Sequence, residues 1–237
     1  MSGARLIAVA LCALGASGCS EGDRAERTLD ADVDRVSFAT RGRLEIVVGD
    51  EPGLVLEAED EDALDRLSIE VEGDRLVVKE RDDATSWFSW MKKNEVEARV
   101  VVRSLEAVGF AGAGELDVSG VRGQGLAVQI AGRADCVIDG LAVEELTVEI
   151  AGAADCSVNG RAARQTLQIA GAGDYRGYGL ETEFTEVEVA GAGGVQVNAT
   201  DMLHVAVSGV GNVQYLGDPA LHEDVAGWGS VERAEGP

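Results

Sequence analysis

Apolar and polar residues alternate along most of the chain, which is the pattern of β-strands that bury one face. In the second half this alternation recurs at a fixed spacing, because a small residue followed by glycine ends each alternating run. These pairs begin at Ala111, Ala131, Ala151, Ala170, Ala190, Ser208 and Ala226, in steps of 18–20 residues. One repeat of this length is too short to bury its own apolar face, so neighbouring repeats must stack on one another.

The sequence therefore predicts an all-β protein built as a right-handed, single-stranded parallel β-helix, a solenoid with repeats of about 20 residues. We expect regular repeats over residues 108–231 and a less regular β portion over residues 31–107 that opens the same solenoid. The recurrent glycines should supply positive φ angles or close packing where the chain turns a corner. Equivalent inward residues such as Val128, Val148, Leu167 and Val187 should form one column.

Residues 1–18 have the features of a bacterial secretory leader. Arg5 precedes the apolar run Leu6–Leu14, which is shorter than the roughly 20 residues of a membrane-spanning helix. Small residues then lead to Cys19, in an arrangement that resembles a lipobox and implies lipidation of Cys19. An ordinary secreted protein is the alternative. Residues 19–30 read as a flexible tether and residues 232–237 as a tail.

Charge narrows the range of partners. The chain has 43 acidic and 20 basic side chains, giving a formal net charge of −23. Binding to nucleic acid needs basic side chains that neutralise phosphates, so we expect no nucleic-acid partner. Glycine is frequent, at 31 residues, while proline occurs only 3 times, which favours many turns in a regular β architecture over a flexible linker.

Cys136 and Cys156 occupy the same position in consecutive repeats, so both thiols should point inward. Two interpretations stay open: buried free thiols that act as small apolar side chains, or a disulfide formed in an oxidising compartment. The spacing of adjacent strands, about 4.8 Å, is wider than the Cβ–Cβ distance that a disulfide prefers, which favours the thiols.

Acidic residues recur at one corner of the repeats, at Asp135, Asp155 and Asp174, after Glu115 in the same series. A solvated outer row that keeps the protein soluble is the simple interpretation, and weak Ca²⁺ binding is the alternative. We expect no cofactor, no other metal site and no catalytic residues. A carboxylate pair could in principle serve a β-helical carbohydrate-active enzyme, but nothing in the spacing singles one out.

One segment departs from the composition of the rest, because it gathers aromatic and basic side chains. It contains Trp87, Phe88, Trp90, Met91, Lys92 and Lys93. Such a segment could cap the open apolar end of a solenoid. It could instead form an exposed patch that touches a membrane surface or a protein partner.

The repeated corners Ala111-Gly-Ala-Gly114, Ala170-Gly-Ala-Gly173 and Ala190-Gly-Ala-Gly193, with the ending Val213–Pro219, resemble the head GIN domain family of putative auto-transporter adhesins. The resemblance covers about 200 residues and implies a β-helical envelope protein, typically a lipoprotein, without established catalytic residues. It implies a non-enzymatic role in adhesion or envelope interactions, with the outer membrane as the expected location. The expected partners are the membrane, through the lipid anchor, and an envelope protein or surface polysaccharide. The alternative is a protein-binding component of signalling or envelope stress.

Overall fold

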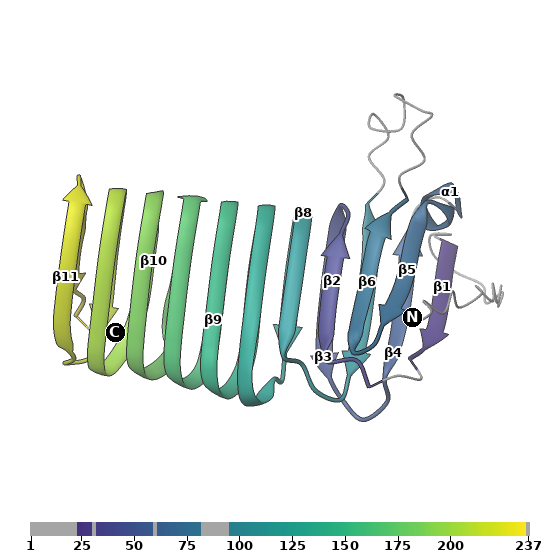
Figure 1. Ribbon diagram of the computed structural model, residues 1–237, viewed down its shortest axis with the longest axis horizontal. Helices are drawn as coiled ribbons and strands as arrows, with labels where there is room; N and C mark the ends of the chain where they lie inside the picture. Colours follow the sequence, from purple (N-terminus) through teal and green to yellow (C-terminus); the bar gives the residue numbers. More distant parts are fainter. Residues whose placement is uncertain (1–22, 30–31, 59–60, 82–94, 236–237) are drawn as a thin grey trace.

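The computed structural model describes residues 23–29, 32–58, 61–81 and 95–235, and these residues form an all-β fold (Figure 1). Within them the strands join into one 12-stranded sheet. The strands of the first half are β1 (Asp23–Thr28), β2 (Arg35–Ala39), β3 (Gly42–Val48), β4 (Gly53–Ala58), β5 (Leu67–Glu72), β6 (Arg75–Glu80) and β7 (Val96–Val102). Those of the second half are β8 (Ala107–Ser119), β9 (Arg122–Ala172), β10 (Tyr175–Leu216), β11 (Ala220–Gly227) and β12 (Ser230–Arg233). A short helix, α1 (Glu61–Asp65), follows β4, and no helix in the described residues has the length and apolar character to span a bilayer.

From Ala107 onward, each segment of the chain runs parallel to the segment one repeat earlier (Figure 1). Strand β8 pairs with β9 so that Val108 lies opposite Val128, a step of 20 residues. Strand β9 pairs with β10 at the same step, and β10 pairs with β11 at a step of 18 residues. The spacing of the sequence repeats is therefore the spacing of the backbone pairing.

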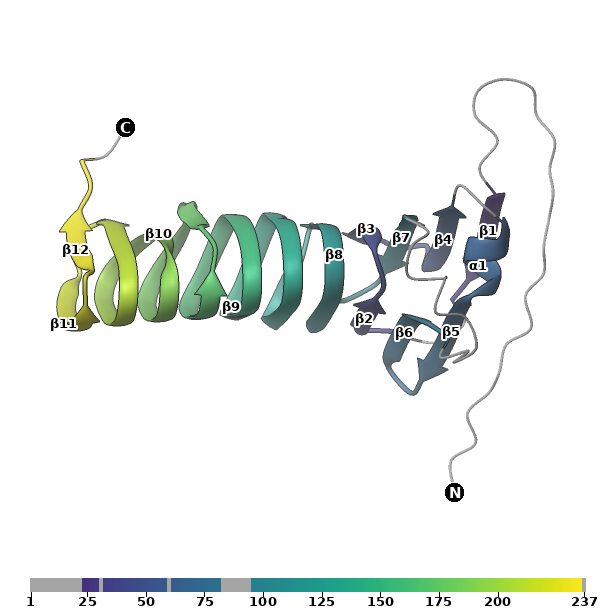
Figure 2. The ribbon, with the colours of Figure 1, turned by 90° about the horizontal axis from the view of Figure 1, so that it is seen from above.

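Strands β9 and β10 contain 51 and 42 residues because the chain bends at each corner without leaving the sheet (Figure 2). Glycine makes these bends at one position per repeat, with φ between 125° and 151°, a range that other residues rarely adopt. We call this set the glycine column: Gly112, Gly132, Gly152, Gly171, Gly191, Gly209 and Gly227. A Cβ atom on any member after Gly112 would overlap the carbonyl oxygen of the preceding member, and on Gly112 it would overlap the carbonyl oxygen of Thr40.

The inward side chains of successive repeats form one continuous apolar core. Val128, Val148, Leu167 and Val187 are each fully buried, and Leu167 lies opposite Val187 in the β9–β10 register. Burying each such side chain contributes roughly 1.5–3 kcal/mol before conformational entropy is counted. Stability therefore depends on repeats staying in register, because a slip of one residue would turn these side chains outward.

The first half only partly continues the repeat. Strands β2 and β3 pair in parallel with β8, and β6 and β7 pair in parallel with β2 and β3. Strands β1, β4 and β5, in contrast, pair antiparallel, so the prediction that residues 31–107 simply open the same solenoid is wrong for them. The two-residue connection Gly73–Asp74 explains β5 and β6, because a link this short joins antiparallel strands, whereas parallel strands need a long crossover.

The last repeat lies at the end of the sheet, with β11 paired to β10 along one side. All eight residues of β11 are exposed, and Glu223 takes the inward position that Val205 occupies one repeat earlier. An inward charge on an edge strand opposes pairing with the sheet of another molecule. We infer that Glu223 helps to end the stack.

The glycine column predicts the outcome of a matched pair of substitutions in β9. Gly123 and Gly152 have φ angles of 143° and 135°, but a Cβ on Gly123 would meet no atom within 4 Å. Gly123→Ala should therefore cost about 1–2 kcal/mol of backbone strain alone. Gly152→Ala adds the overlap with Gly132, and its thermal midpoint should lie roughly 4–8 °C below that of Gly123→Ala. Equal midpoints for the two variants, measured by circular dichroism, would show that the close glycine contact is not required.

Candidate functional site

Two of the predicted sites lie outside the described residues. One is the lipidation site, Cys19. The other is the aromatic and basic segment: Trp87, Phe88, Trp90, Met91, Lys92 and Lys93. Their roles stay predictions.

The predicted acidic row lies at one corner of the repeats, where two of its carboxylates bind backbone. Glu115 and Asp135 are opposite one another in the β8–β9 register. Further along, Oδ1 of Asp155 accepts the N–H of Asp174 at 3.1 Å, and Oδ1 of Asp174 accepts the N–H of Gly194 at 2.8 Å. These two side chains therefore fasten one repeat to the next where the chain turns, a structural role that the sequence reading did not include.

Arginine side chains partly neutralise the same corner. Arg43 lies 3.3 Å from Glu115 and 2.6 Å from Asp117, and the charge of Asp117 raises the pKa of the Arg43 guanidinium. Among residues 23–29, 32–58, 61–81 and 95–235, no three His, Cys, Asp or Glu side chains are grouped in a way that could hold a metal ion. The alternative of weak Ca²⁺ binding by Asp135, Asp155 and Asp174 gains no support from this corner.

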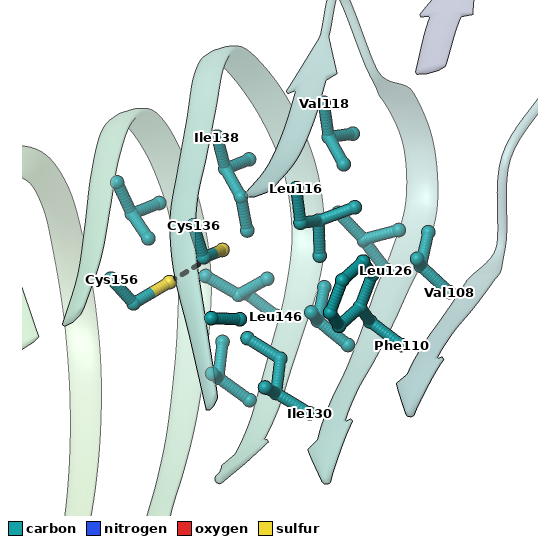
Figure 3. Close-up of a cluster of buried hydrophobic side chains, with 14 of the residues drawn as sticks. Val108, Phe110, Leu116, Val118, Leu126, Ile130, Cys136, Ile138, Leu146 and Cys156 are labelled. Atoms are coloured by element: carbon teal, nitrogen blue, oxygen red, sulfur yellow. Dashed lines mark hydrogen bonds between the residues drawn. The ribbon is translucent and has the colours of Figure 1, made fainter. Parts of the chain in front are cut away.

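Cys136 and Cys156 meet inside the repeat region. Leu116 lies opposite Cys136 and Tyr175 lies opposite Cys156, so the four side chains belong to one inward column. The two Sγ atoms are 2.7 Å apart and point toward one another (Figure 3). Contact with the Cys156 thiol, and then burial, raise the pKa of Cys136 well above its ordinary value, so the dithiol form holds its protons at neutral pH.

A small polar group is buried beside the cysteines. Nε2 of Gln165 donates to Oη of Tyr175 at 2.6 Å, and the hydroxyls of Thr182 and Thr185 are 2.6 Å apart. Burial also raises the pKa of Tyr175 well above its ordinary value, which keeps the phenol neutral. Hydrogen bonds of this kind offset the cost of burying polar atoms.

An open groove runs along the outside of five consecutive repeats, next to the glycine column. Its volume is about 510 Å³, and its lining comes from residues 149–151, 168–170, 188–190, 206–208 and 224–226. Small side chains such as Ala151, Ala170 and Ala190 are exposed within it. Along one side, Nε2 of Gln168 donates to Oε2 of Glu188 at 3.1 Å, so amide and carboxylate alternate between repeats.

Neither the groove nor the buried polar group was predicted from the sequence, although both leave a signal there. Counting back by twos from inward Leu167 places Gln165 inward, and the register puts Thr185 opposite it. Glu149, Gln168 and Glu188 recur at outward positions one repeat apart, beside the alanines. The periodicity that located the core thus also locates these polar side chains.

The fold resembles several crystal structures. A putative adhesin from Bacteroides fragilis is similar with a TM-score of 0.79 and 19% identity, over 93% of this chain and 100% of that one. A putative lipid binding protein from Parabacteroides distasonis is similar with a TM-score of 0.64 and 19% identity, over 91% and 98% of the two chains. A putative adhesin from Parabacteroides merdae has a TM-score of 0.57 and 19% identity, over 92% and 98%. At these identities the likeness shows a shared fold.

Comparison of sequences gives a family but no characterised relative. No curated protein matches the chain. The profile of one family matches residues 32–219, most of the described chain. This match confirms the resemblance inferred from the repeated glycine corners. The chain belongs to the family described as putative auto-transporter adhesin, head GIN domain.

Proposed function

We propose that the chain is a lipid-anchored, non-enzymatic protein of a bacterial cell envelope that presents the flank of a β-helix for adhesion or for contacts with other envelope components. The right-handed, single-stranded parallel β-helix is part of this proposal. Parallel pairing at steps of 18–20 residues and the glycine column support it, because both are what stacked repeats require. Membership of a family described as adhesins supports the role in contact.

The observation that carries the contact role is the groove on the outer flank. It spans five repeats, so it offers an extended surface to a long partner such as a surface polysaccharide or a strand of an envelope protein. Its floor of alanine side chains allows close approach, and the row of Gln and Glu side chains beside it offers hydrogen-bond donors and acceptors. Repeat proteins commonly use such extended surfaces for binding.

The anchoring role rests on the leader and on Cys19. Acyl chains on Cys19 would hold the protein at the membrane, at about 0.8 kcal/mol for each buried CH₂ group. Residues 19–30 would then serve as the tether between the membrane surface and the β fold. The membrane that we propose is the outer membrane, as the residue after Cys19 is serine.

Lipidation can be tested with an alkyne-bearing fatty acid fed to cells that express the full chain. The wild type should take up the label and remain in the membrane fraction. Cys19→Ser should lose the label and move to the soluble fraction, while Cys12→Ser, a change within the leader, should keep it. Labelling of Cys19→Ser, or an unlabelled wild type, would rule out Cys19 as the anchor.

The contact surface can be tested by filling the groove. Ala170 lies in the groove, whereas Ala172, two residues further along β9, is also exposed but is not part of its lining. Ala170→Tyr should weaken binding to whole cells, or to isolated envelopes, of the source bacterium at least tenfold, about 1.4 kcal/mol. Ala172→Tyr should bind as the wild type does. Titration of the fluorescently labelled proteins measures both affinities. Equal affinities for the two variants, or no binding by the wild type, would contradict the role of the groove.

A further inference from the structure

Cys136 and Cys156 are placed as a disulfide requires. They occupy one inward column in consecutive repeats of β9, and adjacent strands in a sheet are about 4.8 Å apart. That spacing falls within the Cα–Cα range of about 4.4–6.8 Å found in disulfides. The wider Cβ spacing expected from the sequence assumed that the two side chains stand parallel, whereas in the structure they turn toward each other (Figure 3).

The distance between the sulfur atoms points the same way. The two Sγ atoms are 2.7 Å apart, about 0.7 Å more than a covalent S–S bond. Non-bonded carbon atoms already prefer about 3.5–4.0 Å, and sulfur is the larger atom. Two separate thiols would therefore be crowded at this position, and a bond between them relieves the crowding.

We propose that Cys136 and Cys156 form a disulfide bond in the exported protein, which closes the segment 136–156 into a covalent loop across two repeats. The proposal rests on the export described under the proposed function, because disulfides form and persist in oxidising compartments outside the cytosol. Neither cysteine is more than 1% exposed, so the bond lies inside the apolar core.

The oxidant is a disulfide-bearing thiol oxidoreductase of that compartment. The thiolate of one cysteine attacks the disulfide of the oxidoreductase, which forms a mixed disulfide and releases one thiolate of the oxidoreductase. The thiolate of the second cysteine then attacks the mixed disulfide, which forms the Cys136–Cys156 bond and releases the second thiolate. Two electrons pass to the oxidoreductase, and its thiolates take up the two protons that the cysteines lose.

Burial fixes when this exchange takes place. Exchange needs an accessible thiolate, and in the folded protein both sulfur atoms are covered. The bond therefore forms while the two repeats are still open, before the stack closes over them. Once folded, the disulfide should resist reducing agents in native buffer and should become reducible only when this part of the core opens.

Counting free thiols in denaturant tests the bond. The full chain and the double variant Cys136→Ala/Cys156→Ala are purified from the exporting cells, unfolded without reductant and alkylated with iodoacetamide. Mass spectrometry should show equal numbers of added groups in both proteins. Reduction before alkylation should add two more groups to the wild type only. Two extra groups on the wild type without reduction would show that the cysteines are free thiols and would overturn the proposal. Because the count is made on unfolded protein, it holds even if the variant folds poorly.

Thermal unfolding gives a second measurement. The thermal midpoint of the wild type should fall by roughly 5–10 °C when reductant is present during unfolding. Reductant should not change the midpoint of the double variant, and a wild type equally insensitive to reductant would overturn the proposal. The intact mass also reports whether the leader has been removed. Free thiols in a chain without its leader would refute the disulfide and leave export standing, whereas a retained leader would refute export.

Discussion

Each repeat of the second half lies on the previous one with glycine against glycine, so close that a single methyl group would strike a backbone carbonyl. This contact sets the register of the parallel pairing at the corner, and the pairing in turn carries the apolar side chains inward. From Gly112 to Gly227 the same contact recurs once in every repeat. The core, the buried cysteine pair and the outer groove all depend on it, because each is made of residues brought together from successive repeats.

This arrangement separates the two faces of the sheet by chemistry. Inside, aliphatic columns are interrupted only locally, where Gln165 and Tyr175 satisfy one another next to the cysteines. Outside, carboxylates are spread along the corners and flank, where they cap the backbone or pair with an arginine or an amide. The high negative charge of the chain is thus compatible with close stacking of its repeats. A surface built this way is uniform along its length, which suits contact with extended partners.

The sequence predicted the second half well because one signal, the 18–20-residue spacing, determines strands, register and core together. Val128, Leu167 and Val187 could be placed inward from periodicity alone. The first half lacks the repeat, so the antiparallel pairing of β1, β4 and β5 could not be read from alternation, which is the same for parallel and antiparallel strands. The groove was missed because it is formed by small side chains, which carry no chemical signal of their own. The approach of the two cysteine sulfur atoms depends on side-chain direction, which strand spacing does not give.

The distance between equivalent exposed residues in different repeats tests the stacking most directly. Ala111, Ala190 and Ala226 are all exposed and follow the same position of the repeat, four and six repeats along from Ala111. Spin labels at these positions, measured by pulsed electron resonance, should be about 19 Å apart for the pair 111 and 190, and about 29 Å apart for the pair 111 and 226, apart from the length of the labels. Distances that do not increase by about 10 Å between the two pairs would show that the repeats are not stacked at the spacing of adjacent strands.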